Sequence, residues 1–522
     1  MIRRILLVAA DASEESFQAS RWGSHPLGLM YIAAAAREAF PDTEIRIFQT
    51  LTSRDYETAL PRVLREFEPD LIGLRALSFF RDQFSALSRI IRQTLPGRPI
   101  IGGGPHVSSA YDQLLEAGEI DLAVIGEGEE TFSALLTILN RGEPMPVDLV
   151  GTAALVDGKA LRNEKRVRIR DLDAVPLPAY DLIDLEQYRG ISNAAHVPPS
   201  HCGYIETSRG CPYRCFYCHI AAEKATHQRS PASVVHEMRK RRDDHGITSF
   251  MFVDDIFNFP QPRAKAVLRK IAAELPGMRL HFPIGLRADQ MDEEMLDLFE
   301  AAGTVMMSLA VETVTPRLQR FIGKNLKIDR AQKMIDAASR RFICTTFFMA
   351  GFPSETKEEM RATIDYAASF DHLCDPTLNI VRVFRDTLLW THLDPTPEQA
   401  RRLDGQTSMR TTPRMFTTDP FVFYGDIFDR DKVPLTSDDI AELRIEWLQK
   451  VQFNPQRIVN SYEMMRRFLD EEDVARTYQS WLNDERFTMR KMQRMLEFGR
   501  AQINRNPPAI RQPAPTRLKM TA

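Results

Sequence analysis

Three cysteines on one short loop constrain this chain more than any other feature of its sequence. Cys211, Cys215 and Cys218 lie in the run Ser208-Arg209-Gly210-Cys211-Pro212-Tyr213-Arg214-Cys215-Phe216-Tyr217-Cys218. Thiolates are the ligands of iron–sulfur clusters, and a closed electron-transfer cluster takes four of them. Three thiolates can hold three irons of a [4Fe-4S] cube and leave the fourth iron open to a substrate or a cofactor.

A structural zinc site is the alternative, with Cys202 or His219 as the fourth ligand of a tetrahedron. Zinc sites usually combine Cys-x2-Cys with a second pair of ligands, and no second pair follows here. The spacing therefore favours the cluster. Cys344 and Cys374 are isolated, and each is expected to be a small buried hydrophobic residue rather than a ligand.

Composition and length favour a cytoplasmic protein of roughly three domains. Six cysteines in 522 residues are too few for a disulfide framework, and metal-binding thiols must stay reduced, so we expect a cytoplasmic location. The apolar run Ile5–Ala10 ends at Asp11 and predicts a buried first strand rather than a signal peptide. No stretch approaches the ~20 apolar residues that a membrane span needs. With 68 basic against 71 acidic residues, bulk charge does not indicate a nucleic-acid partner.

Residues 1–142 are predicted to form a doubly wound, flavodoxin-like parallel sheet. Short β-rich runs alternate there with stretches that can be helical. The runs are Ile5–Ala10, Glu44–Phe48, Asp70–Leu74, Pro99–Gly102 and Asp121–Ile125. Ligands bind such sheets beyond the carboxyl ends of the strands, where the strand order reverses. One loop expected at that point contains Gly103 and Gly104, which let a ligand approach the backbone closely.

The alternation resumes over residues 201–395 and predicts a partial (β/α)6 barrel. The expected strands lie near Tyr204–Thr207, Thr248–Val253, Arg279–Gly285, Val305–Ala310, Thr345–Met349 and Leu378–Val383. The carboxyl-end loops of barrels carry their chemistry. Asp254 and Asp255 directly follow the second expected strand. They could accept hydrogen bonds from an ammonium group, or they could cap a helix.

The Cys-x3-Cys-x2-Cys run resembles the signature of the radical S-adenosylmethionine (SAM) superfamily. This resemblance implies that the open iron of the cluster chelates SAM, and that an electron from the cluster cleaves SAM to a 5′-deoxyadenosyl radical. Segments around Arg229, Glu312 and 348–356 are also similar to the family, whereas its Pro-Gly-Thr turn is absent after the sixth strand. The SAM-binding residues that the resemblance implies are Tyr217, Asp254, Glu312, Gly351 and Val383.

Residues 1–142 resemble the cobalamin-binding domain that precedes many radical SAM cores, in the class B methylase-like subfamily. The similar segments are 25–29, 69–74, 101–106 and 125–129. Where related domains supply a histidine ligand after the first strand, this chain has Ser13. Either cobalamin binds without a protein imidazole, or the domain has lost the cofactor. The cobalamin-binding residues that the resemblance implies are Ser13, Ser78, Gly103, Gly104, His106, Gly126 and Glu127.

Arg75 ends the third strand at the switch point and is the predicted catalytic residue. A cation at the lower face of the corrin would not coordinate cobalt and would disfavour a sixth ligand, which would ease donation of a methyl group. Alternatively, Arg75 pairs with Asp82 or contacts the phosphate or the propionamides of the cofactor. For His106 we expect a hydrogen-bonding role in its loop rather than cobalt ligation.

The remaining segments connect or cover these two domains. Residues 143–200 are rich in proline and resemble the connector of the family, which is expected to fix the two cofactor domains relative to each other. Apolar residues at helical spacing predict a small helical domain over 396–505, either as a packing cap or as a lid on the open side of the barrel. Residues 506–522 contain four prolines and predict a disordered tail.

Together the resemblances imply a cobalamin-dependent radical SAM enzyme that methylates an unactivated carbon of a small-molecule, lipid or peptide natural product. The alternative is a radical SAM cyclase, rearrangement or epimerisation enzyme that uses cobalamin as a redox or structural element, or lacks it. A cobalamin or redox sensor would leave the SAM motifs without a role. The expected partner is an electron donor such as flavodoxin or ferredoxin.

Overall fold

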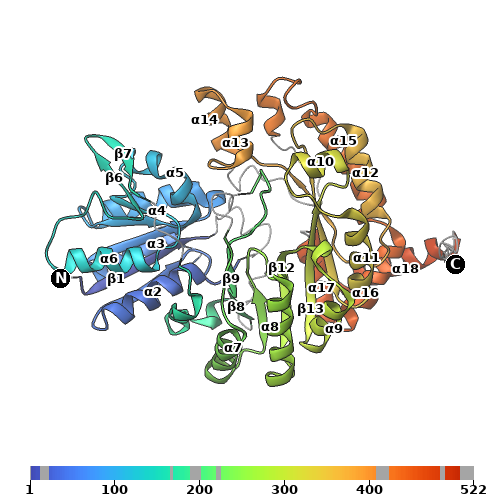
Figure 1. Ribbon diagram of the computed structural model, residues 1–522, viewed down its shortest axis with the longest axis horizontal. Helices are drawn as coiled ribbons and strands as arrows, with labels where there is room; N and C mark the ends of the chain where they lie inside the picture. The colour runs from blue at the N-terminus through green and yellow to red at the C-terminus, as the bar shows by residue number, and fades with distance from the viewer. Residues whose placement is uncertain are drawn as a thin grey trace, which may run out of the picture.

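The computed structural model of the protein contains two α/β domains side by side and a set of helices at the C-terminal end (Figure 1). It describes residues 2–11, 23–53, 55–164, 169–188, 202–218, 225–406, 423–482 and 488–505. None of the helices in these ranges is both long and apolar enough to cross a membrane.

The first domain has the predicted flavodoxin-like sheet. Five parallel strands lie in the order β2-β1-β3-β4-β5, so the order reverses between β1 and β3. Their bounds are β1 Arg4–Ala10, β2 Glu44–Gln49, β3 Leu71–Ala76, β4 Ile100–Gly103 and β5 Leu122–Val124. The run Ile5–Ala10 is buried throughout because its alternate side chains enter two different hydrophobic cores on the two faces of the sheet.

Helices cover both faces of this sheet. One core contains side chains of α2 (Leu27–Ala39) and α6 (Glu129–Asn140). The other contains side chains of α3 (Tyr56–Phe67), α4 (Arg81–Thr94) and α5 (Gly104–Glu116). The carboxyl edge of the strands is left to the loops, as the prediction of a ligand site requires.

The first sheet continues past residue 142, into the segment predicted to be a linker. Strands β6 (Thr152–Val156) and β7 (Lys159–Arg162) form an antiparallel hairpin that extends the sheet beyond β5. Asp157 and Gly158, the two residues of its turn, both have positive φ angles, of 48° and 76°. Such a turn favours an Asp-Gly pair, so the sequence carried a hairpin signal here.

The second domain is the predicted partial barrel. Six parallel strands follow one another in chain order across the sheet, from β8 to β15. They are β8 Cys202–Ile205, β11 Ser249–Phe252, β12 Arg279–Leu286, β13 Thr304–Glu312, β14 Ile343–Ala350 and β15 Thr377–Ile380. The helices between them are α7 Pro231–His245, α8 Gln261–Glu274, α9 Glu293–Ala301, α10 Pro316–Phe321, α11 Ile328–Ser339 and α12 Lys357–Ala368.

The last helices do not form a lid over the barrel opening. Helices α16 (Pro455–Arg466), α17 (Glu471–Leu482) and α18 (Met489–Arg505) share a hydrophobic core with Val305 and Ile343, at the starts of β13 and β14. They therefore cover the amino ends of the strands, and the lid prediction is wrong for them. Helix α15 (Ser437–Trp447) packs on α12 at the side of the barrel.

The two domains meet through the carboxyl-end loops of both sheets. Phe79, after β3, contacts Phe384, after β15, with ring centroids 5.4 Å apart. Arg209, after β8, pairs with Glu129, after β5. The connector contributes Tyr180, whose buried hydroxyl is hydrogen-bonded to both the amide and the carbonyl of Tyr204 in β8, at 2.9 Å each. The edges that should carry the two cofactors thus face each other.

Candidate active site

The cysteine loop follows β8 and is held at both ends. Its first residues, β9 (Ser208–Arg209), pair with β10 (His227–Gln228). Further along, the Phe216 amide donates to Ile322 O at 3.0 Å, and the Phe216 carbonyl accepts from the Leu389 amide at 2.7 Å. The loop is therefore fixed by the segments that follow β13 and β15.

Gly323 lets a neighbouring segment pass close beneath this loop. It has a positive φ of 69°, and a Cβ atom here would lie 2.5 Å from the carbonyl oxygen of Arg214. Real Cβ atoms do not approach backbone that closely, so any larger residue would push the loop away. Cys215 directly follows Arg214, so a larger residue at position 323 would also displace this cysteine.

The three thiols suit a cluster better than a single metal ion. Among the described residues, no group of three or more His, Cys, Asp or Glu side chains could hold one metal ion. In a cubane each cysteine binds a different iron, so the thiols need not converge on one point. Cys202, offered as a fourth zinc ligand, begins β8 at its far end and is buried; His219 lies outside the described residues.

Arg287 supplies positive charge near two of these thiols. Burial raises the pKa of the Cys211 thiol, while the Arg287 guanidinium opposes that shift and also interacts with Cys215. Arg287 follows β12, stacks on the ring of Tyr213 at 3.8 Å and pairs with buried Asp289 at 3.0 Å. A fixed cation favours the thiolate forms that iron requires.

Asp254 and Asp255 organise the start of the cysteine loop. Asp254 Oδ1 accepts hydrogen bonds from the Thr207 amide (3.1 Å) and from the hydroxyls of Thr207 (2.7 Å) and Ser208 (2.6 Å). Asp255 Oδ2 accepts from the Gly210 amide at 2.8 Å. Helix α8 begins only at Gln261, so the helix-cap alternative is wrong.

The second carboxylate oxygen of Asp254 can accept a hydrogen bond from a ligand. Its Oδ2 atom is buried without a hydrogen-bond partner in the described part of the chain, and burial raises the pKa of this carboxyl. An orphaned carboxylate oxygen is costly unless a donor completes it. The predicted contact with the SAM ammonium would supply that donor.

Glu312 lies at a break in the sheet. It ends β13 with a φ of 70°, and the pairing with β14 shifts register between Ala310 and Glu312. Such a bulge turns a side chain out of the regular alternation. The Glu312 carboxylate is buried and pairs with Lys324 at 2.9 Å. A SAM contact would therefore be made by a neutralised ion pair.

Gly351 is explained by protein contacts rather than by a cofactor. Its amide donates to Glu355 Oε2 at 2.6 Å, and its carbonyl accepts from the Tyr424 hydroxyl at 2.7 Å. With φ at 92°, a Cβ atom would lie 2.5 Å from the ring of Phe423. Burial raises the pKa of Glu355 to about 8. The expected adenine contact at Gly351 stays a prediction.

The other SAM-associated residues lie in or near the barrel, where Tyr217 is half-buried. Tyr217 contacts Phe352 with ring centroids 5.6 Å apart, which places the cysteine loop against the end of β14. Val383 is buried just after β15. Arg229 forms an ion pair with buried Glu237, so its charge is already balanced.

At the carboxyl edge of the first sheet, Arg75 pairs with Asp11 at 2.8 Å. The alternative pairing with Asp82 is wrong, because Asp82 lies against Arg81 at 3.5 Å. Gly104 has a φ of 84°, and a Cβ atom there would lie 2.8 Å from Arg75 Cγ. The absence of a side chain at Gly104 therefore leaves room for the Arg75 side chain. A Cβ atom at neighbouring Gly103 would meet no atom within 4 Å.

The polar groups of two other predicted cobalamin-binding residues already have protein partners. Gly126 adopts a φ of 78° and donates its amide to Ser108 Oγ at 3.1 Å. Glu127 accepts from the Ile169 amide of the connector at 2.7 Å, so it is engaged by the protein. Ser13 lies outside the described residues.

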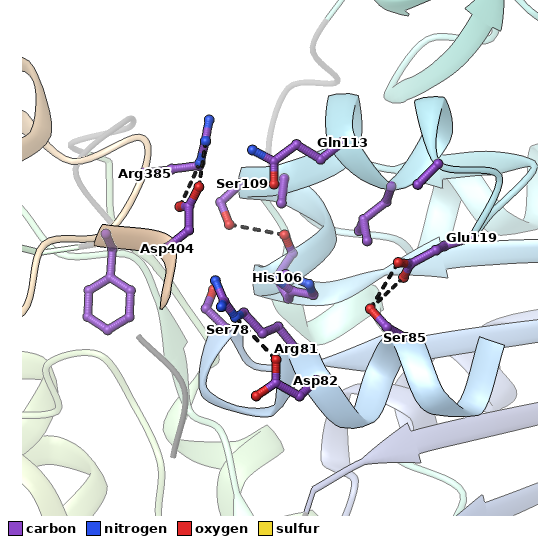
Figure 2. A pocket seen from close by; sticks show the side chains of 14 residues that line it. Ser78, Arg81, Asp82, Ser85, His106, Ser109, Gln113, Glu119, Arg385 and Asp404 are labelled. Carbon is purple, nitrogen blue, oxygen red and sulfur yellow. Dashed lines mark hydrogen bonds and ion pairs between the residues drawn. The ribbon is translucent and has the colours of Figure 1, made fainter. Parts of the chain in front are cut away.

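Ser78 and His106 line a cavity of about 310 Å³ beside this edge (Figure 2). Its walls come from α4 and α5 on one side and from Phe384, Arg385 and Asp404 on the other. Burial lowers the pKa of His106 to about 4, so the imidazole is neutral. The ring packs edge-on against Phe84 at 5.4 Å.

Sequence reasoning missed the role of Arg209, which connects the cluster loop with the first domain. Its guanidinium pairs at 2.7 Å with both Glu206 and Glu129, and lies 3.9 Å from Glu127. Burial raises the pKa of Glu206 to about 7. Segments 125–129 and 208–218 each resemble a family motif and could be found in the sequence. Only the fold shows that the two segments touch.

Comparison with protein families agrees with this geometry. Residues 23–136 match the B12 binding domain, and residues 205–367 match the radical SAM superfamily. The solved structure of the radical SAM methyltransferase TsrM from Kitasatospora setae, with cobalamin and a [4Fe-4S] cluster bound, is similar in fold, with a TM-score of 0.64 and 20% identity. The match covers 96% of this chain and 100% of that one.

Two curated relatives cover two thirds or more of this chain. The protein named uncharacterized methyltransferase PH0819 from Pyrococcus horikoshii is 27% identical over 75% of this chain and 83% of its own length. The anaerobic magnesium-protoporphyrin IX monomethyl ester cyclase of Rubrivivax gelatinosus is 24% identical over 67% of this chain and 63% of its own length.

The chain is a radical SAM enzyme that carries an N-terminal B12-binding domain. Its cofactors are accordingly a [4Fe-4S] cluster, SAM and cobalamin. The residues fit them: three thiols share one loop, an orphaned carboxylate oxygen lies beside it, and an open glycine edge faces it from the other domain.

Proposed function

We propose that this enzyme transfers a methyl group from SAM to an unactivated carbon of a small-molecule, lipid or peptide substrate. The observation that carries the proposal is the facing of the two carboxyl edges, joined by the contacts of Phe79 with Phe384 and of Arg209 with Glu129. A group that passes between cobalamin and a SAM-derived site needs that juxtaposition. The methyltransferase names of the relatives support it.

In this proposal each cofactor has its own residues. Cys211, Cys215 and Cys218 hold the cluster. Asp254 and the pair of Glu312 with Lys324 orient SAM. When bound, cobalamin supplies a metal centre that can carry a methyl group.

The cobalamin edge supplies the other residues of the proposal. Arg75 remains the proposed catalytic residue, because a guanidinium cannot coordinate cobalt as an imidazole does. Its pair with Asp11 holds the guanidinium at the switch point of the first sheet. Gly103 and Ser78 line the same edge, so we assign them to the cofactor.

A cyclase or another radical rearrangement enzyme is the second candidate. The resemblance to a magnesium-protoporphyrin IX monomethyl ester cyclase favours it, because that relative is 24% identical over 67% of this chain. In that case cobalamin would serve another purpose than methyl transfer, and no methyl carbon would leave SAM for the product.

Anaerobically reconstituted enzyme with methyl-labelled SAM separates the two candidates. We expect the labelled methyl carbon in a product extracted from the reaction, with S-adenosylhomocysteine formed in proportion. Deoxyadenosine without transfer of label would instead establish the second candidate. The Cys215→Ala variant, treated identically, corrects for non-enzymatic methylation by SAM.

We also propose an electron-donor partner and a cellular location for the enzyme. A cluster that must be reduced needs an electron donor such as flavodoxin or ferredoxin. All six cysteines are free thiols in the structure, and ligand thiols must stay reduced. We therefore place the enzyme in the cytoplasm.

A further inference from the structure

Arg382 lies at the boundary of the two cofactor domains. It follows β15, between Val381 and Val383, whose side chains are buried in the core of the barrel. Because successive side chains of an extended segment point to opposite sides, Arg382 points away from that core. Its guanidinium carbon is 5.4 Å from the ring centroid of Phe79, in the loop after β3 of the first domain.

No described residue of the protein balances the charge of Arg382. Within the described part of the chain its Nη1 atom is buried and has no hydrogen-bond partner, and no acidic side chain pairs with the guanidinium. Burial alone lowers the pKa of Arg382, to about 10, so the group is still a cation at neutral pH.

Other arginines at the same boundary differ in this respect. Arg75 pairs with Asp11, and Arg209 pairs with Glu129. Arg385, three residues after Arg382, makes a two-pronged ion pair with Asp404, with distances of 2.9 Å and 2.7 Å, at the edge of the cavity in Figure 2. Among the described residues, a partly buried cation with an unpartnered Nη1 atom is therefore a property of Arg382 and not of the boundary as a whole.

A buried polar atom without a hydrogen-bond partner is costly unless a ligand completes it. The Phe79 ring offers a partial cation–π attraction, but a ring face cannot satisfy the in-plane N–H groups. Anionic oxygens can, because the guanidinium fork matches a carboxylate or phosphate in a bidentate way. The site is next to the cavity of about 310 Å³, since Phe384 both lines that cavity and contacts Phe79.

We propose that Arg382 is an anion subsite that binds a carboxylate or phosphate group of the methyl-accepting substrate between the two domains. This proposal rests on the proposed function, and it narrows the substrate class to acids. SAM and cobalamin also carry one such group each. In radical SAM enzymes the SAM carboxylate chelates the open iron, so that group is already bound without Arg382.

Titration of holoenzyme with simple anions tests the proposal. Inorganic phosphate and acetate would be titrated calorimetrically into enzyme loaded with cluster, cobalamin and SAM. We expect Arg382→Gln to weaken the affinity for at least one probe about tenfold or more, the effect of losing a charge-assisted hydrogen bond, and Arg382→Lys to recover part of it. The matched control is Arg385→Gln, which removes a cation already paired with Asp404 and should change the affinity less than about twofold.

Three outcomes would overturn the proposal. They are wild-type enzyme that binds neither probe, equal affinities in wild type and Arg382→Gln, and a loss of hydroxocobalamin or SAM affinity of about tenfold in Arg382→Gln. The last would assign the anion to a cofactor. Cofactor content of each variant confirms that it is folded. The titration needs no turnover, so anion binding through Arg382 without transfer of label would contradict only the proposed function.

Discussion

Replacing Cys215 with alanine should abolish both the brown absorbance of the reconstituted enzyme and all cleavage of SAM. A cube held by three protein thiolates has no spare ligand among the described residues, because Cys202, Cys344 and Cys374 are buried away from the loop. Loss of one thiolate therefore removes an iron site. Iron content, visible absorbance and deoxyadenosine formation under reducing conditions would measure the effect.

The matched control for this experiment is Cys344→Ala. Cys344 is also a buried thiol of the barrel, in the interior of β14, where burial raises its pKa well above the usual range. The variant loses packing but no ligand, so it should retain cluster and SAM cleavage. Retained SAM cleavage in Cys215→Ala would reject the assignment of the cluster ligands.

Replacing Arg209 with methionine should lower the free energy of unfolding by about 3 to 5 kcal/mol, the usual cost of removing one partner from a buried ion pair. Glu206 and Glu129 would lose the cation that they share at 2.7 Å. Because Glu129 belongs to the first domain and Cys211 follows Arg209 by two residues, the change should also loosen the cluster loop. Urea denaturation of the holoenzyme and iron content would measure the two effects.

Arg239→Met is the corresponding surface variant. Arg239 pairs with Glu274 at the same distance of 2.7 Å, but the two side chains are 41% and 35% exposed, and solvent-accessible pairs contribute little. It should leave stability and iron content nearly unchanged. Equal stabilities for the Arg209 and Arg239 variants would mean that the contact between the domains does not depend on the Arg209 network.

The sequence was most informative where local pattern decides the structure. Buried parallel strands are short apolar runs, so the five parallel strands of the first sheet and the six of the barrel were visible in order. The hairpin of β6 and β7 was missed although Asp157 and Gly158 signalled its turn. Proline content nearby had suggested a linker, and turn chemistry was the stronger signal.

Partners that are far apart in the sequence could not be predicted. Arg209 and Glu129 are 80 residues apart, and nothing local says that they meet. The amphipathic pattern of α16–α18 showed which face is apolar, but it could not show that this face covers the amino ends of β13 and β14. Arg382 looked like any other charged residue, because the absence of an acidic partner among the described residues is a property of the fold and not of the sequence.

Anomalous X-ray diffraction from crystals of the holoenzyme, recorded at the iron and cobalt absorption edges, would test most directly that two cofactors lie at facing carboxyl edges. We expect an iron peak beside Cys211, Cys215 and Cys218, and a cobalt peak at the edge of the first sheet near Arg75 and Gly103. A lone metal peak without iron signal at the cysteines, or cobalt anywhere other than that edge, would contradict this arrangement.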